Sequence, residues 1–225
     1  LVIDSTQPEV MEVALQHYGG RVLLNSINLE EGEERARRLL GLARDFGAAV
    51  IALTIDERGM ARTVEDKLQV AERLYELAVG EFGLAPADLV VDMLTFTVGS
   101  GDATLRDAAV QTLEAIARFK ERHPEALTIL GVSNISFGLK PAARQPLTSV
   151  FLHLATERGL DLAIVDAAKI LPLARLDATT LRLAEDLLLD RRSAAGDEPL
   201  TAYLRHFATV GGHFGAPVAS ETLPL

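Results

Sequence analysis

Six short apolar segments alternate along the chain with longer amphipathic ones, and this alternation restricts the fold more than any other feature. The apolar segments are hydrophobic at successive positions, which is typical of parallel strands buried on both faces. The segments between them carry apolar residues three and four positions apart, as helices do. Six β-then-α units in succession predict a parallel α/β fold, either a (βα) barrel or a doubly wound sheet. The predicted strands are Leu1–Asp4, Val22–Ser26, Ala48–Ile55, Leu89–Phe96, Leu127–Ser133 and Leu160–Asp166.

The predicted strands are too few for the usual eight-stranded barrel. If the fold is a barrel, we expect its first two βα units upstream of Leu1, because the chain opens inside a predicted strand. Beyond the last strand, helical patterns over 178–191 and 200–208 precede a glycine-rich segment, Gly211–Pro217. We therefore expect a barrel domain over residues 1–192, and a linker with a C-terminal tail helix over residues 193–225.

The charge balance and the lack of cysteine exclude several functions. The chain has 22 Lys and Arg against 32 Asp and Glu, a net charge of −10, so we expect neither nucleic-acid nor membrane binding. Without cysteine, disulfides, thiolate zinc sites and cysteine nucleophiles are excluded. This composition suits a cytoplasmic location, and no apolar run is long enough to cross a bilayer.

Polar side chains gather where the predicted strands end. Because the carboxyl ends of parallel strands share one rim in a barrel, these side chains should converge on a single mouth, where barrel active sites are built. The alternative is that they only cap the turns that follow the strands. The polar ends are Asp4-Ser-Thr, Asn25-Ser, Thr54-Ile-Asp56, Asp92, Ser133-Asn-Ile-Ser136 and Asp166.

These strand ends are rich in carboxylates and carboxamides and poor in nucleophiles. The five histidines are scattered, and the HExxH and Gly-x-Ser-x-Gly motifs of zinc and serine hydrolases do not occur. Asp4, Asp92 and Asp166 could hold Mg²⁺, but we favour a site without a metal. A ring of Asp and Asn suits a flat heterocycle with several ring donors and acceptors, such as a pterin.

Several motifs resemble the folate (pterin-binding) domain of cobalamin-dependent methionine synthase. The resemblance covers about residues 1–192, in order and at compatible spacing. The methyltetrahydrofolate:corrinoid methyltransferases and the dihydropteroate synthases share this barrel. The matching motifs are Asp4-Ser-Thr, Asn25-Ser-Ile-Asn-Leu-Glu-Glu-Gly-Glu33, Ile55-Asp-Glu-Arg-Gly59, Gly131-Val-Ser-Asn-Ile-Ser-Phe-Gly138, Ala142-Ala-Arg-Gln145, Ser149-Val-Phe-Leu152 and Gly159-Leu-Asp-Leu-Ala-Ile-Val165.

The resemblance implies a (βα)8 TIM barrel of the pterin-binding type that lacks its first two βα units. It implies that the domain binds 5-methyltetrahydrofolate and presents the N5 methyl group to cob(I)alamin, which another domain carries, as part of a methyltransferase. Zinc would belong only to a separate homocysteine domain. Asn134, beside N5, would stabilise the protonated amine as the methyl group leaves, with Asp92 as the second catalytic residue. The substrate-binding residues would be Asp4, Asn25, Asp92, Asn134, Arg144 and Asp166.

The chain also departs from the family pattern. Methionine follows Asp92 where the family often has proline, and Asp166 stands where the family often has asparagine. A Ser-Arg-Lys-like segment, expected of a dihydropteroate synthase, is replaced by Ser133-Asn-Ile-Ser136, which disfavours that activity. Two other hypotheses are a non-catalytic docking module of a multidomain protein and a barrel lyase or aldolase that uses Lys169. Lys140 and Arg144 are possible counter-charges for an anionic folate tail.

Overall fold

A computed structural model of the chain describes residues 1–192 and 198–209. Its main element is a parallel sheet of six strands in the order β1-β2-β3-β6-β7-β8. The strands follow the chain order, so each βα unit places its strand beside the previous one. Their bounds are β1 (Val2–Asp4), β2 (Leu23–Ile27), β3 (Ala49–Leu53), β6 (Leu89–Asp92), β7 (Leu127–Gly131) and β8 (Leu162–Ile164).

Successive residues of each strand alternate between the two faces of this sheet. Val50 and Ala52 of β3 belong to the main core, where the sheet packs against helices. Ile51, between them, joins Val90 and Ile129 in a second, smaller core on the opposite, inner face. Both faces are therefore apolar, which explains why the strands read as continuous hydrophobic segments.

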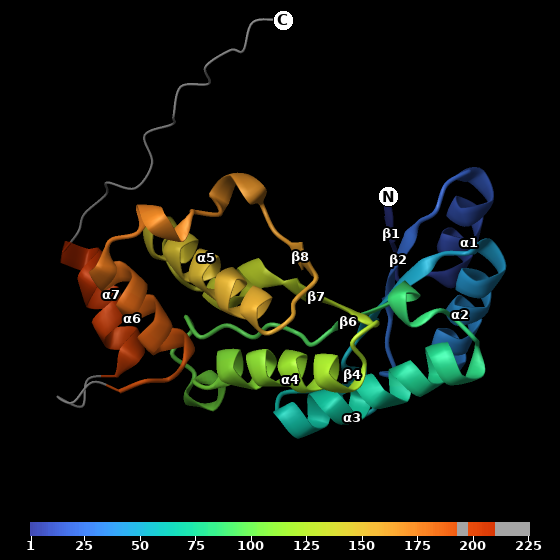
Figure 1. The fold of residues 1–225 in the computed structure, drawn as a ribbon, viewed down its shortest axis with the longest axis horizontal. Helices are drawn as coiled ribbons and strands as arrows, with labels where there is room; N and C mark the ends of the chain where they lie inside the picture. The colour runs from blue at the N-terminus through green and yellow to red at the C-terminus, as the bar shows by residue number, and fades with distance from the viewer. Residues whose placement is uncertain (193–197, 210–225) are drawn as a thin grey trace, which may run out of the picture.

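The helices lie on the outer face of the sheet. Figure 1 shows α1 and α2 at one end, α3 and α4 below the middle, and α5 to α7 at the other end. A doubly wound sheet carries helices on both faces, so this arrangement excludes that alternative. The helices are α1 (Pro8–His17), α2 (Glu34–Phe46), α3 (Val64–Tyr75), α4 (Ala108–Arg122), α5 (Pro141–Glu157), α6 (Ala178–Leu188) and α7 (Pro199–Thr209).

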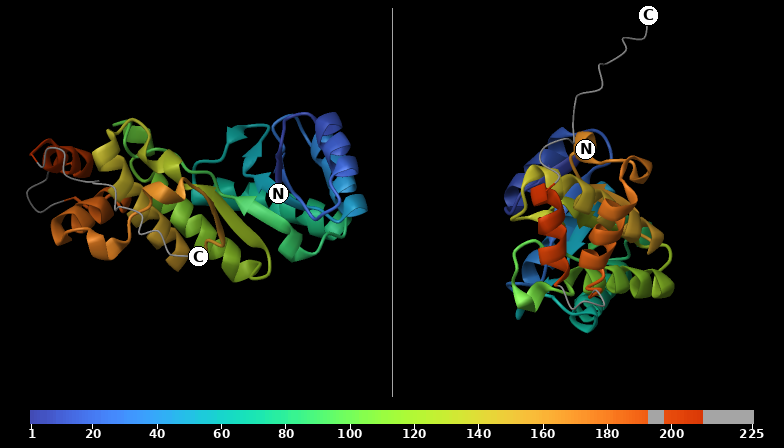
Figure 2. Two further views of the ribbon diagram at one scale, coloured as in Figure 1. Left: turned by 90° about the horizontal axis from the view of Figure 1, so that it is seen from above. Right: turned by 90° about the vertical axis from the view of Figure 1, so that its left-hand side faces the viewer.

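The fold is a partial TIM barrel, as predicted. The curled sheet is a half-barrel whose edge strands are β1 and β8. Seen from above, the molecule is elongated, with α1 and α2 at one end and α6 and α7 at the other (Figure 2). The expectation that two further βα units precede Leu1 remains a prediction.

Four strands end at least two residues earlier than predicted. β3 stops at Leu53, β6 at Asp92, β7 at Gly131 and β8 at Ile164. The segment after β3 instead forms a small antiparallel hairpin of β4 (Ile55–Asp56) and β5 (Gly59–Met60), with Gly59 at φ 102°. Hydrophobicity alone does not separate a strand from the apolar turn that follows it, so the sequence did not predict these ends.

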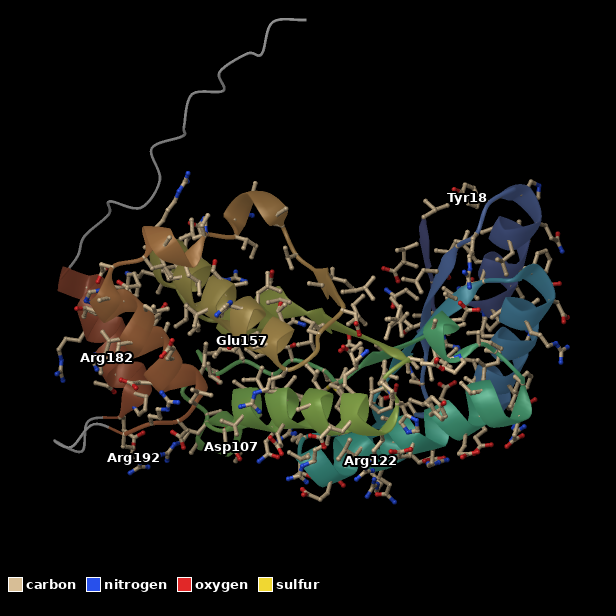
Figure 3. All side chains as sticks on the ribbon, in the orientation of Figure 1. Tyr18, Asp107, Arg122, Glu157, Arg182 and Arg192 are labelled. Atoms are coloured by element: carbon tan, nitrogen blue, oxygen red, sulfur yellow. The ribbon has the colours of Figure 1, made fainter. Side chains whose placement is uncertain are left out.

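Ion pairs and an aromatic stack join α4 to α3 on the outer surface. Arg122, labelled in Figure 3, donates to Glu72 over 3.0 Å, and the same carboxylate lies 2.7 Å from Nε2 of His123. The His123 ring stacks on Tyr75 with 3.8 Å between ring centroids. These contacts hold together the two helices that support β3 and β6, and so position the middle of the sheet.

The C-terminal helices pack onto the barrel. The predicted helices over 178–191 and 200–208 are confirmed as α6 and α7, with slightly different bounds. Tyr203 of α7 is fully buried and its hydroxyl donates to the carbonyl oxygen of Ala143 in α5 over 2.7 Å. The start of the predicted linker (193–197) and the glycine-rich segment (211–217) lie outside the described residues, so the domain boundary at residue 192 remains a prediction.

Candidate functional site

The carboxyl ends of all six strands of the main sheet line one open cleft of about 540 Å³, here termed the rim cleft. Strand register explains the convergence: Asp4 pairs with Asn25 across β1 and β2, and Leu53 pairs with Asp92 across β3 and β6. Residues paired in this way share a face of the sheet. Five of the six predicted substrate-binding residues line the cleft: Asp4, Asn25, Asp92, Asn134 and Asp166.

Asp92 is the buried acid of the rim cleft, with 8% of its surface exposed. One carboxylate oxygen accepts a hydrogen bond from the backbone N–H of Leu94 over 2.7 Å. Burial raises the pKa of Asp92 to about 6, while the hydrogen bond from Leu94 and the charge of Lys67 act in the opposite direction. The second oxygen makes no hydrogen bond within the described residues, so it is available to a ligand.

Asp4, Asn25 and Asn134 bring further unused hydrogen-bonding capacity. Asn25 and Asn134 are half-buried and Asp4 is exposed. Among the described residues, none of these three side chains has a protein hydrogen-bond partner, although all three line the rim cleft. Polar groups in such a cleft are normally satisfied by water or a ligand, which is the arrangement expected of a binding site.

Asn134 lies on η4 (Val132–Ser136), a short 3₁₀ helix directly after β7. The Ser136 hydroxyl closes this turn by donating to the Ser133 carbonyl oxygen over 3.1 Å. The Asn134 carboxamide packs on Gly131, where an added Cβ atom would lie 3.0 Å from Nδ2. A glycine at residue 131 therefore leaves the room that the Asn134 side chain occupies.

Replacing Gly131 with alanine should weaken the binding of a flat heterocyclic ligand in the rim cleft about tenfold, because displacing a contacting side chain by a fraction of an ångström is costly. The backbone of Gly131 has φ −75°, which alanine adopts freely, so the fold should be retained. Calorimetric titration with a pterin and circular-dichroism melting curves test this. Wild-type affinity in a folded Gly131→Ala variant would contradict the role of this contact.

Arg144 does not line the rim cleft. It lies in an adjoining pocket of about 360 Å³ that shares Ser133 and Asp166 with the cleft. Its guanidinium donates to the Ser136 hydroxyl over 3.2 Å and to the Ser133 carbonyl oxygen over 3.3 Å. Arg144 therefore braces the turn that carries Asn134. Lys140 is exposed at the start of α5 and lines neither pocket.

Asp166 is exposed at the mouth of the cleft. It forms an ion pair with Lys169 over 2.7 Å, and this contact lowers the pKa of the Asp166 carboxyl group. The Lys169 side chain is 66% exposed, whereas lysines that form Schiff bases are usually activated by burial. The geometry therefore gives the lyase or aldolase hypothesis no support.

Sequence reasoning missed one ionisable group at this end of the sheet. Lys67 of α3 is fully buried, and its ammonium donates to the carbonyl oxygens of Met93 and Leu94, directly after Asp92. Its spacing of four and seven positions from the buried Ala71 and Leu74 was the available signal, because a lysine within the buried stripe of a helix needs a partner.

Residues 1–192 and 198–209 contain no group of three or more His, Asp or Glu side chains placed to hold a metal ion. None of the helices among them is both long and apolar enough to cross a membrane.

Comparison with known proteins agrees with this geometry. Residues 1–166, which include every residue of the rim cleft, match the family described as pterin binding enzyme. The chain belongs to the pterin-binding enzyme family. It is 46% identical over 213 residues to the methionine synthase of Mycobacterium tuberculosis, and 45% identical over 225 residues to that of Mycobacterium leprae.

These alignments cover 93% and 99% of this pterin-binding chain. The chain spans 18% of the length of each relative. The resemblance to the pterin-binding domain of methionine synthase is thereby confirmed.

Proposed function

We propose that the rim cleft binds 5-methyltetrahydrofolate by the edge of its pterin ring and positions the N5 methyl group for transfer to cob(I)alamin held by another domain. The observation that carries this proposal is the convergence of Asp4, Asn25, Asp92 and Asn134, each with hydrogen-bonding capacity that the described protein does not use. The family match and the methionine synthase relatives support the same substrate class.

The chemistry of these side chains suits a pterin. The carboxylates of Asp92 and Asp4 accept hydrogen bonds from amino and ring N–H groups, while a carboxamide both donates and accepts. Asp92 is buried at the floor of the cleft, where a charge-assisted hydrogen bond is strongest. Leu53 and Ile164 add apolar surface to the same lining, against which a flat ring can pack.

In this proposal Asn134 acts on the methyl-transfer step. The tertiary amine N5 is a poor leaving group until it is protonated, so a group that holds the protonated nitrogen lowers the barrier. The Asn134 carboxamide oxygen can accept a hydrogen bond from that N–H as the C–N bond breaks. Such an interaction accelerates the reaction because it is stronger in the transition state than in the bound substrate.

Calorimetric titration of the 225-residue chain with 5-methyltetrahydrofolate tests the proposal. Saturable one-site binding, weakened by Asp92→Asn, is the expected result. A chain that neither binds 5-methyltetrahydrofolate nor transfers its methyl group to added cob(I)alamin would disprove the proposal. It would favour the alternative that the chain is a docking module.

Binding should also stabilise the fold. At a ligand concentration 100 times the dissociation constant, 5-methyltetrahydrofolate should raise the free energy of unfolding by about 2.7 kcal/mol. Urea unfolding with and without ligand measures this increase. Tetrahydrofolate, which has the same reduced ring but no methyl group on N5, is the matched comparison, and equal stabilisation by both ligands would indicate that the methyl group makes no contact with the cleft.

A further inference from the structure

Lys67 is a buried charge outside the residues that line the rim cleft. Its side chain is fully buried on α3, four positions after the N-cap residue Thr63. The ammonium donates to the carbonyl oxygens of Met93 and Leu94, the latter over 3.2 Å. It also lies 5.0 Å from the centre of the Phe96 ring. An apolar residue would fill this space without burying a charge, so packing alone does not account for a lysine at this position.

The two carbonyl groups belong to the turn that ends β6. Leu94 has φ 58°, a left-handed conformation that a leucine rarely adopts. Three contacts hold it: its N–H donates to Asp92, and its carbonyl oxygen accepts from Lys67 and from the Thr112 hydroxyl over 2.9 Å. The Lys67 ammonium and the Asp92 carboxylate therefore bind the same turn, one through its carbonyl groups and the other through its N–H group.

The charges of the two side chains are also coupled. Burial lowers the pKa of Lys67 to about 7, and the negative charge of Asp92 opposes this decrease. Conversely, burial raises the pKa of Asp92, and the positive charge of Lys67 acts to lower it. Other charged groups near this part of the sheet are Arg62, with its guanidinium carbon 5.8 Å from the centre of the Phe96 ring, and Asp4 and Asp166 in the cleft.

We propose that Lys67 is a positioning residue for pterin binding, which ties the Met93–Leu94 turn to α3 and supplies the positive charge that keeps the Asp92 carboxylate in place and ionised. This inference rests on the proposed function, because Asp92 is the group through which Lys67 would act on the ligand. Lys67 itself does not line the cleft.

The first test needs no ligand. Carbon-13 NMR of the aspartate-labelled chain follows the titration of the Asp92 carboxyl carbon. In Lys67→Met, the pKa of Asp92 should rise by about one unit, because the opposite charge is removed while burial remains. Thr112→Val is the matched control, since it removes the other side-chain contact to Leu94 without changing a charge, and it should leave the pKa of Asp92 where it is in the wild type.

The second test measures 5-methyltetrahydrofolate affinity as a function of pH. If the pKa of Asp92 rises by one unit from about 6, the ionised fraction of Asp92 falls about fivefold at pH 6 and hardly at all at pH 8. The affinity of Lys67→Met, relative to that of Thr112→Val, should fall more at pH 6 than at pH 8. A purely structural lysine would weaken binding equally at both pH values.

An unchanged Asp92 titration in Lys67→Met would overturn the inference. If that variant does not fold, the wild type decides: the Asp92 carboxyl signal should show a second inflection near pH 7 as Lys67 titrates, and its absence would equally overturn the inference. A chain in which the two groups are coupled but which binds no 5-methyltetrahydrofolate would instead disprove the proposed function.

Discussion

Methyl transfer from 5-methyltetrahydrofolate to added cob(I)alamin should be slower by roughly 10²–10³ in an Asn134→Ala variant. This is the scale for the loss of one hydrogen bond aimed at charge that develops in the transition state. The carboxamide lies in the rim cleft without a protein hydrogen-bond partner in the described chain, so its removal should disturb the fold little. Single-turnover kinetics at saturating folate measure the change in the chemical step.

The matched control is Asn28→Ala, which removes another asparagine carboxamide outside the cleft. Asn28 accepts a hydrogen bond from the Glu30 N–H over 3.1 Å, and its loss should change the transfer rate less than twofold. The dissociation constant of Asn134→Ala should rise only a few-fold, because the proposed contact strengthens as the C–N bond breaks. A transfer rate within threefold of the wild type would remove Asn134 from the mechanism.

Asp92→Asn should weaken 5-methyltetrahydrofolate binding on the order of 100-fold, the scale for losing hydrogen bonds to a charged group. The carboxamide oxygen of the variant can still accept from the Leu94 N–H, as the carboxylate does over 2.7 Å. The NH₂ group of the variant side chain then faces the cleft. Because this group and the N–H groups of the pterin are all hydrogen-bond donors, they repel one another. Calorimetry at pH 7.5 measures the loss.

The pH dependence of binding separates this role from a structural one. Burial raises the pKa of Asp92 to about 6, and the ionised form is the one that accepts two N–H groups. Wild-type affinity should therefore decrease as the pH falls through 6, whereas Asp92→Asn should show only the titration of the ligand itself. Asp45→Asn, at an exposed position of α2, should follow the wild type. Parallel wild-type and Asp92→Asn profiles would contradict the assignment.

The chain sequence was sufficient to predict the six strands, most helices and five of the cleft residues. Buried parallel strands are hydrophobic at successive positions, and this local pattern is visible without coordinates. The positions of Asp4, Asn25 and Asp92 at strand ends followed from the same pattern. The hairpin at Ile55–Met60 and the true end of β6 were missed, because both depend on backbone turns within apolar segments.

Arg144 illustrates a different limit of sequence-based prediction. The family resemblance implied a place for it in the ligand site, yet its guanidinium turns to Ser133 and Ser136 and lines the neighbouring pocket. A matching motif places a residue near a site, whereas the direction of a long side chain depends on which acceptors surround it.

The order of the residues by itself determined that the chain alternates strands with helices and that polar groups stand where the strands end, because periodicity and chain order are properties of the sequence. Only the tertiary structure decided which of those groups keep free hydrogen-bonding capacity, and that Lys67 meets a turn 26 positions further along the chain. Burial, hydrogen bonding and charge coupling depend on distances in space, and these exist only after the sheet has curled and α3 has packed against it.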